Sequence, residues 1–270
     1  MASRDPLHYP EEDRQFLEKY LPVRNQSKSD GLPFVTLTFA TSLDSALSLA
    51  PGTQTALSGP QSKAMTHYLR SRHDAILVGV GTAVADNPSL NCRSEGVGGY
   101  GGEGLEGQPR PIVVDPHGRW QLGQNTKILN LAKEGRGKAP WVFTAERPKL
   151  PTLSALQRLG GTVFQLEPKE EGGSMLNWEE ILRTVRETGI ESVMIEGGGA
   201  VINSLLAPEN AHLIDSVIIT IAPTWLGQGG VSVSPPRPAT ETAQPSPVAR
   251  LKDTTWRQLG PDGILCGYLN

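Results

Sequence analysis

Two stretches of the sequence place residues that could bind phosphate groups directly after an apolar strand. In the first, the apolar run VMIE ends at Glu196, and Gly197, Gly198 and Gly199 open a predicted helix. Glycines let the backbone approach a ligand closely, and the free N–H groups at a helix N-terminus favour an anion. The segment therefore predicts a phosphate or pyrophosphate site, although the same glycines could form a tight strand–helix turn without a ligand.

The second stretch is the apolar run AILVGVG, which Thr82, Asp86 and Arg93 follow. Thr and Asp just past the carboxyl end of a strand are well placed to bind ribose or phosphate groups in an open α/β sheet. The planar guanidinium of Arg93 suits bidentate binding of a phosphate. Taken singly, each residue also has an ordinary structural interpretation, with Asp86 as a helix cap and Arg93 in solvent.

A third group starts at Asp44, just beyond the apolar strand PFVTLTFATSLD, and continues with Ser58 and Arg70. A lone Asp after a strand usually forms a turn, and a lone Arg on a helix is usually solvated. The signal lies in the combination, because all three groups follow strands whose carboxyl ends meet at one edge of a parallel sheet.

The frame that must position these residues is an alternation of strands and helices from about residue 33 onward. Apolar runs such as 75–81, 111–115 and 192–196 alternate with amphipathic runs, the first of which Ser58 can cap. This pattern predicts an α/β fold with a mostly parallel central sheet and helices on both faces. The final run TTWRQLGPDGILCGYLN predicts an antiparallel hairpin at one edge.

We expect a single domain over residues 31–270, preceded by a polar N-terminal extension, residues 1–30, with one short docking helix. Two stretches interrupt the alternation, a glycine-rich one at about 96–110 and a proline-rich one at about 234–247. Each lies between strands of the same predicted sheet, so we interpret both as surface inserts.

Composition argues against several classes of function. Lys+Arg 25 against Asp+Glu 28 gives a formal net charge of −3, which does not favour a nucleic-acid partner. The two cysteines have no metal-ligand spacing, and we predict no metal site. The start of the chain lacks the pattern of a secretory signal, and no apolar run reaches the roughly 20 residues that span a bilayer. We therefore expect a cytoplasmic protein without a membrane partner.

Four segments in this order resemble the reductase family of riboflavin biosynthesis: TLTFATSLDS, LSGPQSKAMTHYLRSRHDAILVGVGTAVADNPSLNCR, VMIEGGGAVINSLL and IAPTWLGQGG. The resemblance implies a dihydrofolate-reductase-like fold, NADPH as the cofactor, and a homodimer. It also implies reduction of the ribosylamino side chain of a pyrimidinone 5′-phosphate to the ribitylamino form. Zinc deaminase motifs are missing, so the chain resembles the stand-alone type, whose expected substrate is the 2,5-diamino compound.

The resemblance also assigns roles to individual residues. Asp44 and Glu196 match catalytic acids that face the pyrimidine and the reacting carbon. The positions matching substrate-binding residues are Ser58, Arg70 and Arg93, the two arginines on the 5′-phosphate. The positions matching cofactor-binding residues are Thr82, Asp86, Val163, Gly197, Gly198, Gly199, Ala200 and Val201.

One departure concerns the turn after Asp44, where the family has S-L-D-G and this chain has Ser45 in place of the glycine. Two alternatives stay open. The chain could be a dihydrofolate-reductase-like oxidoreductase for another small substrate, such as a pteridine or the deaminated pyrimidine. It could also be a nucleotide-binding protein without turnover, since a fold alone does not determine a function.

Overall fold

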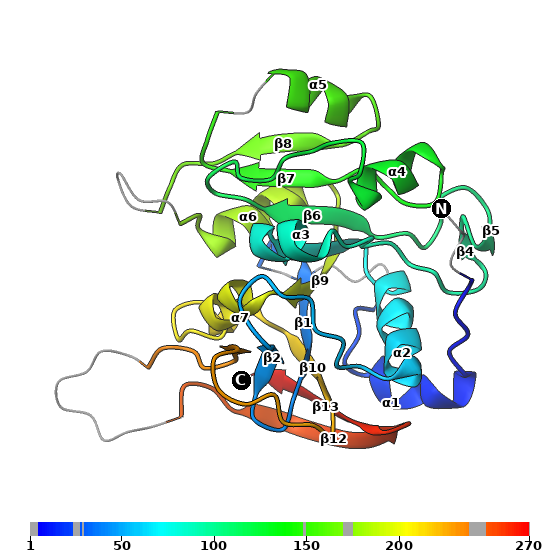
Figure 1. The fold of residues 1–270 in the computed structure, drawn as a ribbon, viewed down its shortest axis with the longest axis vertical. Helices are drawn as coiled ribbons and strands as arrows, with labels where there is room; N and C mark the ends of the chain where they lie inside the picture. Colours follow the sequence, from blue (N-terminus) through cyan, green and yellow to red (C-terminus); the bar gives the residue numbers. More distant parts are fainter. Residues whose placement is uncertain are drawn as a thin grey trace.

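The computed structural model describes residues 5–23, 28, 30–147, 150–169, 175–237 and 247–269. At its centre is a nine-stranded sheet (Figure 1). Its parallel strands are, in order across the sheet, β10 (Ser216–Ile221), β1 (Phe34–Thr41), β9 (Ser192–Gly197), β3 (Ala75–Gly79), β6 (Arg110–Val114), β7 (Trp141–Thr144) and β8 (Thr162–Gln165). Beyond β10 follow the antiparallel strands β13 (Asp262–Leu269) and β12 (Leu251–Leu259). The predicted sheet and C-terminal hairpin are therefore confirmed.

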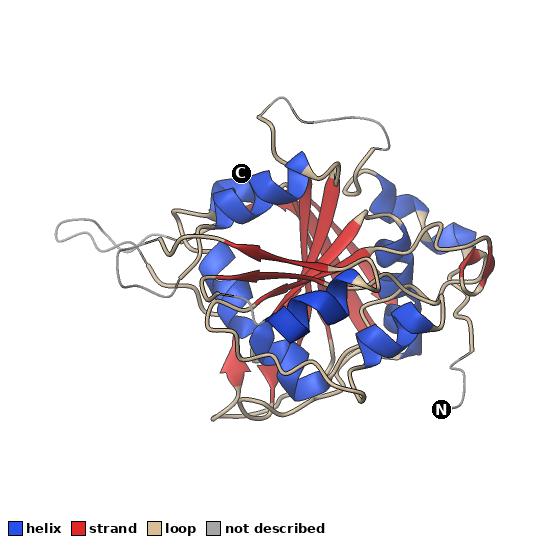
Figure 2. Ribbon diagram, turned by 90° about the horizontal axis from the view of Figure 1, so that it is seen from above, coloured by secondary structure: helices blue, strands red, loops and turns tan. Residues whose placement is uncertain are grey.

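Helices cover both faces of this sheet (Figure 2). One face carries α6 (Trp178–Glu187) and α7 (Gly199–Leu205). The opposite face carries α2 (Pro60–Ser71), α3 (Val80–Asp86) and α4 (Lys127–Lys133). Helix α5 (Leu150–Gln157) contacts β8. Three short helices remain: η1 (Glu11–Asp13) and α1 (Gln15–Glu18) near the N-terminus, and η2 (Ala211–Leu213) before β10.

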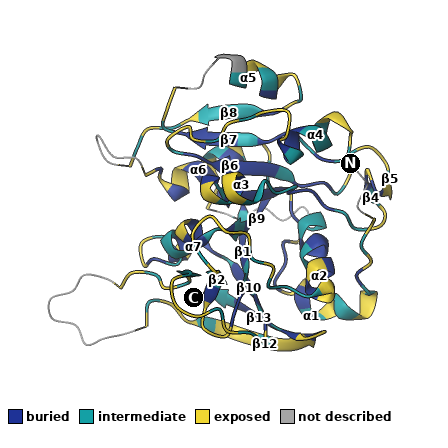
Figure 3. Cartoon of the chain, viewed as in Figure 1, coloured by how far each residue is buried: buried dark blue, intermediate teal, exposed yellow. Residues whose placement is uncertain are grey.

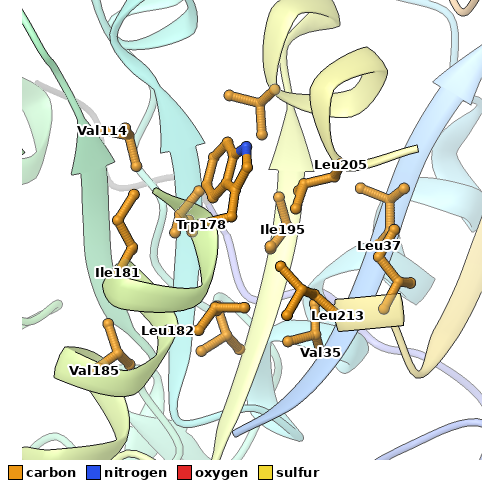
Figure 4. Close-up of a cluster of buried hydrophobic side chains, with 14 of the residues drawn as sticks. Val35, Leu37, Val114, Trp178, Ile181, Leu182, Val185, Ile195, Leu205 and Leu213 are labelled. Atoms are coloured by element: carbon orange, nitrogen blue, oxygen red, sulfur yellow. The ribbon is translucent and has the colours of Figure 1, made fainter. Parts of the chain in front are cut away.

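Strand β9 shows how the core forms. Its side chains alternate, so Val193 and Ile195 pack under α6 while Met194 packs under α2. Figure 4 shows Trp178 of α6 close to Ile195 in the larger cluster. Burial on both faces explains why this run is apolar throughout, and it holds the strand that ends at Glu196.

The order of the strands places the carboxyl ends of β1, β9 and β3 side by side. The chain passes from β1 to β3 and out to β8, and only then returns to insert β9 between β1 and β3. In open α/β sheets, ligands bind outside the carboxyl ends at such a change in strand order. The topology therefore predicts where a ligand would bind.

The start of α2 differs from the sequence prediction. The N-cap residue is Gly59, not Ser58, and no side chain of the cap residue bonds the helix. Instead, the buried carboxylate of Asp262, from the C-terminal hairpin, accepts bonds from Gly59 N (2.8 Å) and Ser62 Oγ (2.6 Å). The prediction of a Ser58 cap is wrong because an acid 203 residues away satisfies these donors.

Regions outside the alternating pattern also have defined structure. The glycine-rich insert forms the short pair β4 (Val97–Gly98) and β5 (Gly101–Gly102), and its Tyr100 is buried. Strand β2 (Ala46–Ser48) pairs with β11 (Val231–Ser232), which the sequence had not suggested. The proline-rich insert lies mostly outside the described residues, which omit 238–246.

Candidate active site

A cavity of about 510 Å³ opens at the carboxyl ends of β1, β9 and β3, and we call it the central cavity. Most of the residues predicted to bind the cofactor line it, together with one of the two predicted catalytic acids. These lining residues are Thr82, Asp86, Glu196, Gly198, Gly199, Ala200 and Val201. The structure therefore brings together residues from two segments that are more than a hundred positions apart in the sequence.

The glycine turn between β9 and α7 is packed too closely for larger residues. A Cβ on Gly198 would lie 2.9 Å from Thr82 Oγ1, and one on Gly199 would lie 2.3 Å from a Val231 methyl group. Gly197 has a φ of +93°, a conformation that favours glycine. The peptide bond between Gly197 and Gly198 is cis. This turn and the start of α3 therefore form one continuous wall.

Glu196 forms a bidentate ion pair with Arg70 of α2. Arg70 Nε donates to Glu196 Oε1 (2.8 Å) and Nη2 donates to Oε2 (2.7 Å), while Nη1 donates to the Asn91 carbonyl (3.0 Å). The side chains are only 13% and 17% exposed. Burial acts to lower the pKa of Arg70. The charge of Glu196 and its hydrogen bonds outweigh this effect, so the pKa of Arg70 is raised above its ordinary value.

The ion pair with Glu196 gives Arg70 a contact other than the substrate phosphate that the sequence predicted for it. In the structure its guanidinium contacts Glu196 and a backbone carbonyl, and Arg70 is not among the residues that line the central cavity. The structure shows directly that Arg70 binds both carboxylate oxygens of Glu196. Its contact with a substrate phosphate stays a prediction.

The carboxylate of Asp44, the other predicted catalytic acid, holds a loop. It accepts bonds from Leu226 N (3.1 Å), Gly227 N (2.8 Å) and the Ser42 hydroxyl. The Ser42 bond, followed by the two backbone bonds, lowers the pKa of this exposed carboxyl to about 2. Asp44 is outside the lining of the central cavity, so its predicted contact with a ligand is untested.

Asp86 has the opposite electrostatic environment. It lies at the end of α3, and burial raises the pKa of its carboxyl group, while the positive charge of Lys127 acts in the other direction. A carboxyl group whose charge is disfavoured is suited to hydrogen bonding with hydroxyl groups. Thr82 lies one turn earlier on the same helix, so both face the glycine turn.

The remaining predicted residues lie outside the central cavity. Arg93 is partly buried in the loop after α3, with its Nη1 donating to the Asp5 carbonyl (2.9 Å). Ser58 precedes α2 and is partly buried. Val163 of β8 lines a separate cavity of about 400 Å³ at the carboxyl ends of β6, β7 and β8, which we call the lateral cavity. Both cavities open along the same edge of the sheet.

Sequence reasoning missed the part of the wall that lies between β1 and α2. Leu47, Thr53 and Thr55 of this segment line the central cavity, as do Phe39 of β1 and Val231 of β11. The segment follows the carboxyl end of the first strand, and that position was the available signal. No motif identified the pairing of β2 with β11 that holds it in place.

Two further observations concern what the described residues do not contain. They include no group of three or more His, Cys, Asp or Glu side chains arranged to hold a metal ion. No helix among them is long and apolar enough to cross a bilayer.

Comparison with known proteins gives a consistent result. Residues 33–265 match the RibD C-terminal domain. A Debaryomyces hansenii protein named 2,5-diamino-6-ribosylamino-4(3H)-pyrimidinone 5′-phosphate reductase is 40% identical over 258 residues, which are 95% of this chain and 96% of that protein. The Saccharomyces cerevisiae protein of the same name is 37% identical over 256 residues, 94% of each chain.

Solved structures are also similar. The Saccharomyces cerevisiae riboflavin biosynthesis reductase Rib7 superposes with a TM-score of 0.74 at 34% identity, covering 96% of this chain and 100% of that one. RibD of Acinetobacter baumannii gives a TM-score of 0.68 at 26% identity, covering 90% of this chain but 59% of the bacterial one.

The buried ion pair makes a prediction about stability. Arg70→Ala leaves the Glu196 carboxylate without its partner and should lower the free energy of unfolding by about 3 kcal/mol. The double variant Arg70→Ala/Glu196→Ala should lose less than the sum of the losses in Arg70→Ala and Glu196→Ala. Urea unfolding measures all three.

The exposed pair Arg183–Glu179, each side chain 49% exposed, is the matched control. Arg183→Ala should change stability by less than about 0.5 kcal/mol. Strictly additive effects of the Arg70 and Glu196 substitutions would show that the pair is not coupled.

Proposed function

The chain belongs to the RibD C-terminal domain family, and we propose that it is a stand-alone, NADPH-dependent reductase of riboflavin biosynthesis. Its substrate is 2,5-diamino-6-ribosylamino-4(3H)-pyrimidinone 5′-phosphate, as the names of its yeast relatives suggest. Its product carries a ribitylamino chain in place of the ribosylamino group. The observation that carries the proposal is the central cavity, where Glu196, Thr82 and Asp86 meet at the glycine turn.

The residues at the central cavity fit the phosphate-bearing part of a dinucleotide. The turn at Gly198 and Gly199 exposes backbone that a Cβ would obstruct, and it opens helix α7. Such a turn suits close approach of a pyrophosphate. Thr82 and Asp86 of the adjoining helix α3 offer a hydroxyl and a carboxyl group to the same cavity. These residues would hold the cofactor, with Ala200 and Val201 supporting the turn.

The lateral cavity fits the adenosine part. Val163 and Val142 give it apolar walls, and Arg147 supplies an exposed cation at its edge. The carboxylate of Asp115, also in its lining, already accepts bonds from Arg119 N (3.0 Å) and Trp120 N (2.7 Å). A guanidinium is well suited to a phosphate, so we propose that Arg147 recognises the 2′-phosphate that distinguishes NADPH from NADH.

In this reaction the protein must orient the substrate and the cofactor and stabilise the charge that develops. The N-glycoside of the ribosylamino group must open to an imine before it can be reduced. The cofactor, when bound, supplies the hydride that C1′ receives, and the imine nitrogen takes up a proton, so that C=N becomes CH–NH. Glu196 carries a negative charge at the wall of the cavity, where it favours the protonated imine and accepts bonds from the ring amino groups.

Arg70 and Arg93 complete this account. Arg70 holds both oxygens of Glu196 and so fixes the plane of that carboxylate. Arg93 binds the 5′-phosphate, as the family resemblance implies, and Asp44 keeps the loop at residues 226–227 in place. Fixing groups before the substrate arrives reduces the reorganisation needed in the transition state.

We further propose a homodimer, formed through an open part of the sheet. The side chains of Phe39, Ile219, Leu265 and Trp256 are aligned across β1, β10, β13 and β12. They share the face on which α6 and α7 lie, beside a groove of about 570 Å³. Trp256 is 64% exposed, and most of strand β12, on which it lies, is exposed (Figure 3). The other three side chains of the row are half-buried. An apolar row of this kind is typical of a contact surface, and a second copy would bury it.

The substrate is tested by the absorbance of NADPH with the diamino compound and its deaminated form in parallel. We expect oxidation with the diamino compound only. Glu196→Gln, which removes the charge, should lower kcat about 100-fold. Oxidation with the deaminated form only would reverse the order of the two reactions, and no oxidation with either would refute the substrate. Unchanged turnover and affinity in Glu196→Gln would refute the role of that residue.

The choice of cofactor is tested by Arg147→Ala. The substitution should raise KM for NADPH about tenfold and leave KM for NADH unchanged, since only NADPH carries the 2′-phosphate. Arg158→Ala, which changes an exposed arginine near the end of α5, is the control. Equal effects of Arg147→Ala on both cofactors would contradict the assignment.

The homodimer is tested by sedimentation equilibrium. Trp256→Glu places a charge in the apolar row and should convert the dimer to a monomer. Trp225→Glu changes another exposed tryptophan, 72% exposed and outside that row, and should leave the dimer intact. A wild-type chain that sediments as a monomer would refute the proposal.

A further inference from the structure

The segment from Asp5 to Leu21 lies outside the residues that match the family and packs on its fold. We call it the N-terminal segment. Its Tyr9, Leu17, Tyr20 and Leu21 are buried, in one cluster with the apolar face of α2 and the C-terminal hairpin. In Figure 1 the chain descends from beside β4 and β5 to α1, below α2.

Polar contacts fix this packing at the C-terminal end of the short helix α1. The Tyr20 hydroxyl bonds to Thr255 Oγ1 (2.8 Å) in the hairpin. Glu18 accepts a bond from Arg72 Nη1 (2.6 Å) at the end of α2. A segment that buries four large side chains and makes these bonds is part of the folded domain.

The start of the N-terminal segment pairs with the loop that carries Arg93. Leu7 N donates to the Arg93 carbonyl (2.7 Å), and Glu95 N donates to the Leu7 carbonyl (3.2 Å). These bonds form a parallel bridge between Leu7 and Ser94. In addition, Arg93 Nη1 donates to the Asp5 carbonyl (2.9 Å). The segment therefore contacts both the backbone and the guanidinium of Arg93.

The other side of the same loop is attached to the core. Arg93 N donates to Nδ1 of His67 on α2 (3.0 Å). Gln108 bonds to both the N–H and the carbonyl of Cys92, at 2.8 and 2.7 Å. The Asn91 carbonyl accepts from Arg70 (3.0 Å). The loop is thus held from the core by α2 and Gln108, and the N-terminal segment closes its outer side.

We propose that the N-terminal segment is a positioning element for Arg93, which orients the guanidinium toward the substrate phosphate. The proposal rests on the proposed function, in which Arg93 binds that phosphate. A side chain that is ordered before binding loses less conformational freedom when the ligand arrives. Loss of the contact should therefore weaken substrate binding and leave the chemical step intact.

The test is Leu7→Pro in the full chain, because proline has no N–H and removes the bond to the Arg93 carbonyl. We expect KM for the phosphorylated substrate to rise about fivefold, with kcat and KM for NADPH unchanged. KM for the same compound without its 5′-phosphate should not change. Leu7→Ala keeps the N–H and is the matched control.

A double variant separates positioning from general destabilisation. If Leu7 acts through Arg93, adding Leu7→Pro to Arg93→Ala should raise KM no further than Arg93→Ala alone. Pro6→Gly loosens the segment without removing a donor, and it should shift KM in the same direction if Leu7→Pro does not fold. Equal losses with both substrates, or additive losses in the double variant, would overturn the proposal.

The controls also separate this proposal from the proposed function. A wild-type chain that does not oxidise NADPH with the phosphorylated substrate would overturn the function, and the proposal with it. An active wild type whose KM is unchanged by both Leu7→Pro and Pro6→Gly would overturn the positioning role alone.

Discussion

The close approach of two strand–helix turns is the constraint on which the site depends. The turn after β9 packs directly against the start of α3, which follows β3 without a linker. Only glycine at positions 198 and 199 permits this distance, because a Cβ would overlap Thr82 or Val231. The cavity exists because these turns meet at the edge where β9 inserts between β1 and β3. A ligand in the cavity would therefore contact the backbone of the turn and, beside it, the side chains of α3.

The ion pair between Arg70 and Glu196 links the end of β9 to helix α2. Glu196 is the next-to-last residue of β9, whose other residues are buried, and Arg70 reaches it from α2. An ion pair removed from water gains little net stability unless both partners are fully hydrogen-bonded. Here both carboxylate oxygens and three guanidinium nitrogens have partners. Its value to the protein lies in orienting a charge at the cavity, in keeping with the proposed reduction of an imine.

Contacts outside the central cavity hold two loops in place. Asp44 binds backbone N–H groups of the loop after β10, and residues 5–7 pair with the loop of Arg93. Neither contact belongs to the central cavity, and the second is the one through which we propose that Arg93 is positioned. The N-terminal segment, expected as a polar extension with a docking helix, buries aromatic side chains against α2 and the hairpin.

Local patterns in the sequence determined the alternation of strands and helices, the antiparallel hairpin and the glycine turn after Glu196. Each depends on residues within about 15 positions of one another, through the periodicity and turn chemistry that a sequence displays. The resemblance added the prediction that Thr82 and Asp86 bind the cofactor. The tertiary structure alone decided that Arg70 pairs with Glu196, that Asp262 replaces Ser58 at the start of α2, and that Val163 lines a second cavity. The physical reason is that these contacts join residues far apart in the chain, and only the order of strands in the sheet brings them together.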